Sequence, residues 1–260
     1  MMQFSPFMTT TSSPSASKPS TSIPTSERVL QVLAHVAGHG SSLTARELAA
    51  QTKLPLSSLY RHLAALKKWG LVQEHANSGF YQPGPLSLQL AWGFDHHSYL
   101  MQIAHSEMVS LMEKSGESVG LLVYVNGQII CLDMLESKQA LRCSFSKGRA
   151  NSVVHGASAK ALLAHLPAAV LAQILADHPV EAAYLPEQLE QCRQQGYAVS
   201  LGEVDPDVWG VSAPVFSSRN RMECTLSLMA PAARAEVRAG ELIALTQAAA
   251  ARIGRQLAGI

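Results

Sequence analysis

The sequence has few cysteines and no long apolar run. Its four cysteines, Cys131, Cys143, Cys192 and Cys224, form no CxxC pair and have no histidine at the spacing of a metal site. They are interpreted as reduced thiols, and we expect neither a metal nor another cofactor. No apolar run approaches the ~20 residues that a membrane helix needs. The chain is therefore expected to be soluble and cytoplasmic, with no membrane partner.

The first residues also lack the continuous apolar segment of a secretory signal. Residues 1–25 are rich in Ser, Thr and Pro and contain one lysine, a composition typical of a disordered tail. With 260 residues and 47% hydrophobic content, the whole chain is long enough for two domains.

Charge is unevenly distributed, although the formal net charge is only +1. Residues 26–85 contain six basic and three acidic side chains, whereas residues 86–260 contain 13 basic and 16 acidic ones. For a polyanionic partner this distribution matters more than the sum.

Residues 26–85 show the pattern of three helices and a hairpin. Apolar residues at helical spacing from Val29 to Val36 predict the first helix, and Thr44 with Glu47 forms a capping box that begins a second one. A third helix, capped by Ser57 or Ser58, is expected to bury one apolar stripe and to end at a glycine; the residues are Leu59, Leu63, Leu66 and Gly70. The runs 71–75 and 80–82, separated by the turn 76–79, predict a small hairpin.

The rest of the chain alternates between helical and extended patterns. One linker helix is expected over 86–115, followed by a hairpin of 119–125 and 128–135 around Asn126-Gly127, and a third strand over 140–145. Further helices are predicted at 157–165, 168–176, 186–195 and 233–257, and further strands at 197–200, 211–216 and 224–229. This order predicts an α+β domain with a central antiparallel sheet over residues 116–260.

The three helices and the hairpin supply what reading of the DNA major groove requires, a winged helix-turn-helix. The third helix of such a unit presents its outward side chains to bases and phosphates, and the hairpin acts as the wing. The predicted DNA-binding residues are Thr44, Ser57, Ser58, Tyr60, Arg61, His62, Lys67 and Lys68, with His75 and Tyr81 on the wing. The alternative is that the three-helix unit mediates contacts with another protein.

Several segments resemble the IclR family of bacterial transcriptional regulators. Residues 43–49, LTARELA, followed by 54–63, LPLSSLYRHL, are similar to its DNA-binding signature, which usually has a Leu-Pro-x-Ser-Thr-x-x-Arg core. In the second half, 155–164, HGASAKALLA, the segment 196–199 leading to Glu203, and 211–216, VSAPVF, are similar to family motifs. The resemblance covers nearly everything after residue 25.

The resemblance implies a GAF-like effector-binding domain and a dimer formed through the DNA-binding unit and the linker helix, often paired into a dimer of dimers. By position, the effector pocket would be lined by Cys143, Ala157, Ser158, Ser200, Glu203, Gly210 and Ser227. Unpaired amides at the start of the helix at Ala157 would suit a carboxylate. The sequence departs from the family at Asp207 and Ala159, where glycine is usual.

The resulting expectation is a regulator of a catabolic operon that binds double-stranded operator DNA and responds to a small organic or aromatic acid. One alternative is a constitutive DNA-binding protein whose second domain only assembles the oligomer. Another is a serine acyl hydrolase, because Ser144 and Lys147 satisfy a Ser-x-x-Lys pattern and His155 lies near Ser158. The histidines 96, 97 and 105 are expected on a solvated or interface face and not at a metal.

Overall fold

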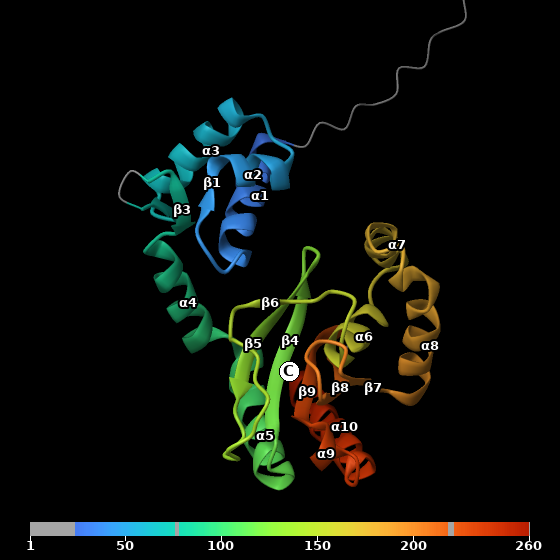
Figure 1. Ribbon diagram of the computed structural model, residues 1–260. Helices are drawn as coiled ribbons and strands as arrows, with labels where there is room; N and C mark the ends of the chain where they lie inside the picture. Colours follow the sequence, from blue (N-terminus) through green and yellow to red (C-terminus); the bar gives the residue numbers. More distant parts are fainter. Residues whose placement is uncertain (1–23, 76–77, 218–220, 260) are drawn as a thin grey trace, which may run out of the picture. The chain divides into compact units, whose positions relative to one another are not determined.

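The computed structural model describes residues 24–75, 78–217 and 221–259, which form two compact units divided between Gly84 and Pro85 (Figure 1). We call them the N-terminal and the C-terminal unit. The predicted tail falls almost entirely on residues 1–23, and half of the predicted hairpin turn falls on residues 76–77; both stretches lie outside the described residues. The first helix begins at Thr25, so the tail was predicted slightly too long.

The N-terminal unit consists of three helices and a small antiparallel sheet, of which the sequence predicts the helices and the hairpin but not the third strand. The helices are α1 (Thr25–Gly38), α2 (Ala45–Thr52) and α3 (Leu56–Lys68), and the strands β1 (Leu43–Thr44), β2 (Val72–Glu74) and β3 (Phe80–Pro83) pair in the order β1-β3-β2. The capping box of Thr44 and Glu47 is present at the start of α2. The predicted serine cap of α3 is wrong, because the helix begins directly after Pro55 without a side-chain cap.

The C-terminal unit contains a six-stranded antiparallel sheet with helices on both faces. Its strands are β4 (Ser118–Val125), β5 (Gln128–Leu135), β6 (Ala150–Asn151), β7 (Ala198–Leu201), β8 (Val208–Phe216) and β9 (Met222–Pro231), paired in the order β6-β5-β4-β9-β8-β7. Its helices are α4 (Leu86–His97), α5 (Tyr99–Ser115), α6 (Ala157–Leu163), α7 (Ala168–Asp177), the 3-10 turn η1 (Glu181–Ala183), α8 (Leu185–Gln195), α9 (Ala232–Ala235) and α10 (Ala239–Ala258).

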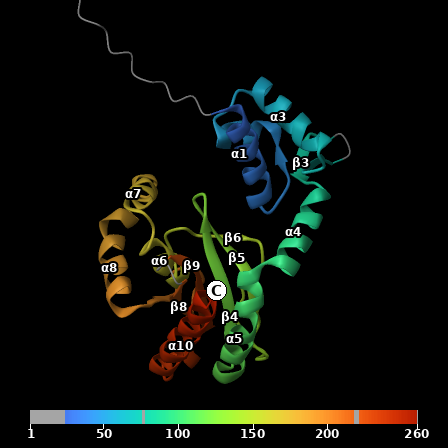
Figure 2. The same cartoon turned by 180° about the vertical axis from the view of Figure 1, so that it is seen from behind.

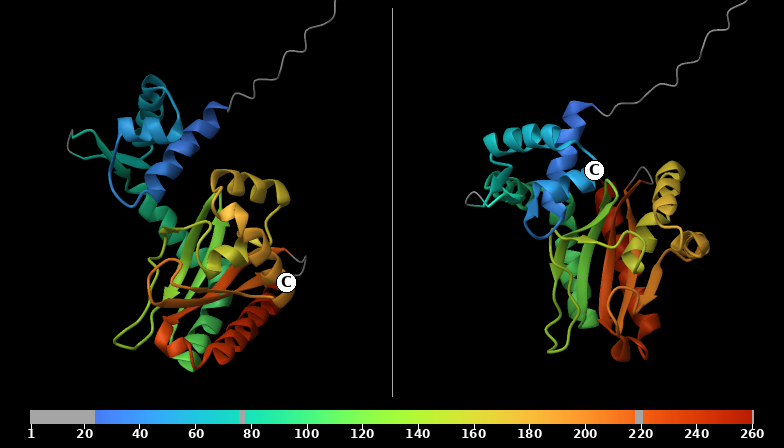
Figure 3. Two further views of the ribbon diagram at one scale, coloured as in Figure 1. Left: turned by 45° about the vertical axis from the view of Figure 1, so that its right-hand side comes forward. Right: turned by 45° about the horizontal axis from the view of Figure 1, so that its top comes forward.

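Alternation along the strands separates the two faces of the sheet. On β9, Leu226 and Leu228 pack in the cluster formed with α5 and α10, which lie side by side in Figure 2. The residues that alternate with these leucines, such as Ser227, point to the opposite face of the sheet, which is covered by the layer of α6, α7 and α8. Figure 3 shows this layer from two other directions. The predicted turn between β4 and β5 is confirmed, since Asn126 and Gly127 both have a positive φ. The α+β fold class is confirmed as well.

The single linker helix predicted over 86–115 is wrong, because the chain breaks at Ser98. This residue is extended, and its hydroxyl accepts a hydrogen bond from the Met101 amide, so it ends α4 and caps α5. The second helix, α5, buries Met101 and Met108 against the sheet and belongs to its core, whereas α4 buries no residue in this chain. Of the predicted linker helix, α4 is therefore the part that follows the N-terminal unit in the chain and lies outside the core of the sheet.

Two further expectations for the C-terminal unit are wrong. Residues 140–145 form no strand, and the edge of the sheet is instead completed by β6, which pairs with Ile129 and Ile130. The predicted helix over 233–257 is divided into α9 and α10. Residues 140–145 alternate like a strand, but none of the described strands pairs with them.

Candidate functional site

The helix α3 is held by its leucines and presents a basic surface. Leu59, Leu63 and Leu66 are buried with residues of α1 and α2, as predicted. Tyr60 is 53% exposed, and Arg61 is exposed beside it. Ser57 and Lys68 are exposed on the same helix, and Ser58 is half-buried. The arrangement provides hydroxyl, phenol and guanidinium groups for contacts with phosphates and base edges.

Two residues predicted to touch DNA lie in the core instead. His62 is only 6% exposed, and burial lowers the pKa of His62, with Arg61 and Arg28 lowering it further. It lies three residues after Leu59 and four before Leu66, so helical spacing places it on the buried face. Tyr81 is also buried, because β3 pairs with the strand β1, which the sequence did not reveal.

Two other predicted DNA contacts have intramolecular partners. Thr44 uses its hydroxyl in the capping box, where it accepts from the Glu47 amide and donates to the Glu47 carboxylate. Lys67 forms an ion pair with Glu74 of β2, and this hydrogen bond raises the pKa of Lys67. His75 is exposed on the wing. The exposed positions outside these pairs lie in the first two turns of α3, where Arg61 donates a long hydrogen bond to Ser58 (3.5 Å), at Lys68 and on the wing.

The C-terminal unit encloses a cavity of about 460 Å³ between the sheet, the start of α6 and two loops. Six of the seven residues predicted for an effector pocket line it: Cys143, Ala157, Ser158, Ser200, Gly210 and Ser227. Its apolar walls include Leu122, Ile129, Phe145, Leu228 and Met229. The structure brings together predicted residues as far apart in the sequence as Cys143 and Ser227, although Cys143 reaches the cavity from a loop and not from the predicted strand.

Three serine hydroxyls meet at the inner end of this cavity. The Oγ atoms of Ser212 and Ser227 are 2.6 Å apart, those of Ser158 and Ser227 2.9 Å, and those of Ser158 and Ser212 3.2 Å. Ser212 was not predicted. It faces the cavity because it lies two residues from Gly210 on β8 and directly opposite Ser227 on β9. Only the strand register identifies it.

Glu203, the seventh predicted residue, does not line the cavity. Its carboxylate accepts a hydrogen bond from the Gly156 amide (3.0 Å) and forms an ion pair with the buried Lys160. Lys160 also donates to the carbonyl of Val199 (3.1 Å). Glu203 therefore fastens its loop to α6 and uses the amide of Gly156, the residue directly before the helix-start amides that were expected to hold a ligand carboxylate.

The two departures from the family pattern have different consequences. Asp207 has a positive φ of 58°, which explains why glycine suits this position, and its side chain lies among the residues that line the cavity mouth. Ala159 is buried in a small cluster with Leu122 and Ile129. Asp207 adds a charge at the mouth, whereas Ala159 adds only apolar surface.

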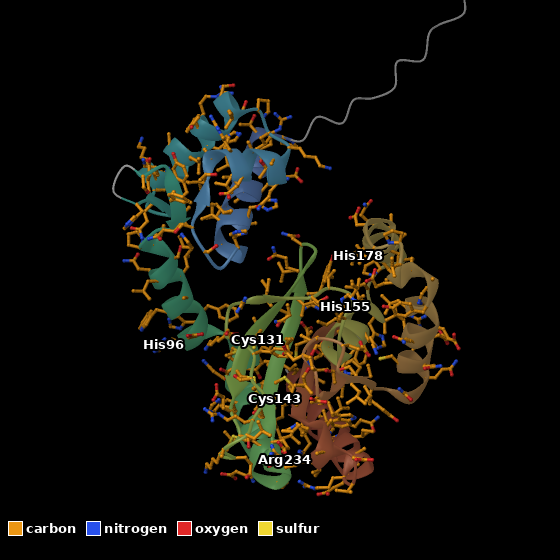
Figure 4. The ribbon with its side chains drawn as sticks, viewed as in Figure 1. His96, Cys131, Cys143, His155, His178 and Arg234 are labelled. Carbon is orange, nitrogen blue, oxygen red and sulfur yellow. The ribbon has the colours of Figure 1, made fainter. Side chains whose placement is uncertain are left out.

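Each basic side chain that lines the cavity already has a carboxylate partner. The Nε of Arg142 donates to Glu136 at 2.7 Å. The Nε2 of His155, labelled in Figure 4, lies 3.2 Å from Glu181, and its Nδ1 lies 3.0 Å from the hydroxyl of Ser152. Desolvation raises the pKa of the Cys143 thiol, which Figure 4 also labels, and Glu117 raises it further.

The groups that suggested an acyl hydrolase are not assembled into a nucleophile and base. Ser144 donates its hydroxyl proton to Glu136 at 2.9 Å, while the Lys147 ammonium pairs with Asp95 and Asp133. Neither residue lies in a helix. Ser158 bonds to the other two serines, and His155 bonds to different partners.

The three histidines expected on one linker helix lie on two helices. His96 and His97 end α4, where both rings pack against Trp92, and His105 lies on α5 near Asp133. Among residues 24–75, 78–217 and 221–259, no group of three His, Cys, Asp or Glu side chains is placed to hold a metal ion. None of the helices in that part of the chain is both long and apolar enough to cross a membrane.

Known proteins match both units. The family model of the IclR helix-turn-helix domain matches residues 25–76, and that of the bacterial transcriptional regulator IclR C-terminal domain matches residues 95–255. The transcriptional regulator BhcR of Paracoccus denitrificans is 26% identical over 80% of this chain and 77% of its own length. KipR of Bacillus subtilis is 26% identical over 84% and 91%, and the repressor IclR of Escherichia coli is 25% identical over 80% of each.

Solved structures show the same fold. An IclR family transcriptional regulator from Brucella abortus superposes with a TM-score of 0.79 at 19% identity, covering 95% of this chain and 97% of that one. A regulator from Alicyclobacillus acidocaldarius gives a TM-score of 0.70 at 21% identity, covering 91% and 99%. The chain belongs to the IclR family of DNA-binding bacterial transcriptional regulators.

Proposed function

We propose that this regulator binds operator DNA through α3 and the wing, and that a small organic molecule in the cavity changes that binding. The observation that carries the proposal is the coexistence in one chain of an exposed basic helix face and a 460 Å³ cavity lined by six residues expected from the family. The helix face suits the major groove, and a cavity of this size suits a metabolite.

A chain of contacts inside the C-terminal unit offers a route from the cavity to α4. Residues 141–145 line the cavity, and shortly after them Lys147 pairs with Asp95 of α4 at 3.0 Å and approaches Asp133 of β5 at 3.7 Å. The DNA-binding unit directly precedes α4 in the chain. A ligand that binds one position of this loop more tightly than another would shift α4 with it.

The surface of α4 favours assembly with a second copy. Four large apolar residues on this helix are exposed: Leu88, Leu90, Trp92 and Phe94. An exposed apolar surface on a helix is best explained by a partner helix. Together with the family resemblance, this supports a homodimer, and a dimer of dimers through the C-terminal units.

The regulated genes are proposed by analogy alone. Family resemblance favours a neighbouring catabolic operon for small organic or aromatic acids, and one relative bears the name acetate operon repressor in Salmonella typhimurium. The case for a carboxylate effector is weaker than the sequence suggested, because Glu203 occupies the Gly156 amide.

The test of DNA binding uses Arg61→Ala and a duplex carrying the upstream region of the coding gene. Loss of a base or phosphate contact should lower affinity about tenfold and reduce the salt slope by about one. Lys114→Ala, at the end of α5, is the control and should leave both unchanged. Unchanged affinity and slope in Arg61→Ala would show that α3 does not read DNA.

The dependence of thermal stability on added ligand distinguishes an effector-binding regulator from a constitutive DNA-binding protein whose second domain serves only assembly. A panel of small metabolites is screened for a rise in the melting temperature of the full chain. A domain that serves only assembly is stabilised by none of them, whereas an effector domain is stabilised by its ligand and relatives of that ligand.

A further inference from the structure

The inner end of the cavity contains no charged side chain. Its buried lining consists of glycine, alanine and apolar residues together with Ser212 and Ser227. The ionisable side chains that line the cavity, Arg142, Cys143, His155, Asp205 and Asp207, are half-buried or exposed. The part of a ligand that reaches the serines therefore lies beyond the charged groups of the cavity mouth.

The charges at the mouth do not favour an anion. Arg142 is paired with Glu136, and His155 lies beside Glu181. Asp205 and Asp207 are exposed there, and neither takes part in any ion pair formed among the described residues. An entering carboxylate would pass two acidic groups and lose water without gaining an unpaired cation.

The three serine hydroxyls accept hydrogen bonds more readily than they supply them. Each hydroxyl has one hydrogen, and three mutual contacts of 2.6, 2.9 and 3.2 Å can use all three hydrogens in a closed ring. Each oxygen then keeps a lone pair. A donor on the ligand adds a hydrogen bond without opening the ring, whereas a pure acceptor must withdraw a hydrogen from it.

Resting on the proposed function, we infer that the effector is an uncharged molecule with an apolar body and a terminal hydrogen-bond donor, a hydroxyl or a carboxamide, which meets Ser158, Ser212 and Ser227. The apolar body lies against Leu122, Ile129, Phe145 and Met229, which line the same cavity. This differs from the carboxylate that the sequence alone suggested, because Glu203 already uses the Gly156 amide beside the start of α6 and each basic side chain that lines the cavity is paired with a carboxylate.

The experiment compares matched acids, amides and alcohols on the full-length protein by isothermal titration calorimetry at neutral pH. The first set is cinnamate, cinnamamide and cinnamyl alcohol, which share one apolar body, and further sets are built in the same way from every compound that stabilises the protein in the metabolite panel. In each set that binds, the amide or the alcohol should bind about tenfold more tightly than the acid.

Variants locate the effect. Ser212→Ala should weaken binding of the amide about fivefold, because it opens the hydroxyl ring, while Ser106→Ala on the exposed side of α5 should not change it. Asp207→Asn, which tolerates the positive φ, should reduce the difference in binding affinity between the acid and the amide.

A carboxylate that binds as tightly as its amide overturns this inference and leaves the proposed function standing. If no set binds and the panel stabilises nothing, the proposed effector function itself fails.

Discussion

The N-terminal unit carries its candidate binding residues on the outer surface of one helix, whereas the C-terminal unit carries them inside a cavity. In α3, Tyr60 and Arg61 are exposed and depend on their neighbours only for the position of the helix. In the cavity, Ser158, Ser212 and Ser227 come from one helix and two strands and bond to one another. A surface site tolerates change around it, and an enclosed site depends on the register of the whole sheet.

The two units also differ in how much core supports them. One cluster of buried residues holds the N-terminal unit, whereas three clusters hold the C-terminal unit. Because a small domain buries a smaller fraction of its surface, its stability depends more strongly on each core residue. The comparison therefore predicts that the same substitution has unequal results in the two units.

The largest expected effect comes from the same core substitution made in each unit, Leu63→Ala on α3 and Leu226→Ala on β9. Both leucines are buried, and each change should cost about 2–5 kcal/mol of the free energy of unfolding. In Leu63→Ala the N-terminal unit should unfold at ambient temperature and DNA binding should disappear. In Leu226→Ala the C-terminal unit should melt at a lower temperature but remain folded. Differential scanning calorimetry of the full chain measures both transitions.

Leu30→Ala serves as the control for the calorimetry. Leu30 is 63% exposed on α1, so its truncation should change the free energy of unfolding by less than about 0.5 kcal/mol. If the two core substitutions lowered the melting temperatures of their units equally, the smaller unit would not be the more fragile one.

The surface site was largely predictable from the sequence, and its errors have physical causes. The spacing of Leu59, Leu63 and Leu66 places α3 correctly and predicts the exposed face. The same spacing, applied fully, also places His62 inside. Tyr81 could not be placed, because its burial depends on pairing with the two-residue strand β1, which is too short to give a pattern of its own.

The cavity was predictable only where the family resemblance reached. Ser158 and Ser227 were found in that way, but Ser212 required the register of β8 against β9. Glu203 was assigned to the ligand because nothing in the sequence reveals its ion pair with Lys160. Pairings between residues far apart in the chain come from tertiary structure, and local propensity does not contain them.

Cysteine labelling sharpens the comparison, because all four cysteines belong to the C-terminal unit. Burial raises the pKa of Cys131 and of Cys192 to about 11, and it also raises the pKa of the fully buried Cys224. Cys143 is half-buried at the cavity, with a smaller upward shift. Iodoacetamide should therefore modify Cys143 about a hundredfold faster than the others.

The labelling should depend on pH in a defined direction. Since only the thiolate reacts and the pKa of Cys143 is raised, its rate should still increase above pH ~9. Mass spectrometry of the digested protein measures each site, and Cys143→Ser should remove the fast reaction. Leu63→Ala should leave the pattern unchanged, since it affects only the N-terminal unit. Fast labelling of Cys224 in the native protein would contradict the tight packing of this sheet.

Lys147→Ala is expected to have the smallest effect on stability. It should nevertheless have the largest effect on the coupling between the cavity and α4. Burial lowers the pKa of Lys147, but its pairing with Asp95 and Asp133 outweighs this, so the net shift is upward. The stabilisation is therefore present at neutral pH and is lost as the pH rises through the raised pKa. Because the pair is partly exposed, its removal should cost less than about 1 kcal/mol.

The consequence should appear in α4, measured by hydrogen–deuterium exchange of residues 86–97. Without the pair, these amides should exchange faster while those of α5 remain protected, because α5 is held by the core of the sheet. Lys138→Ala, an exposed lysine near the same loop, is the control. Asp95→Asn should reproduce the effect on α4, and the double variant should add nothing to it, since both substitutions break the ion pair between Lys147 and this helix. Unchanged exchange of α4 in Lys147→Ala would mean that the cavity loop does not restrain this helix, and the route from the ligand to the DNA-binding unit would have to pass through other contacts.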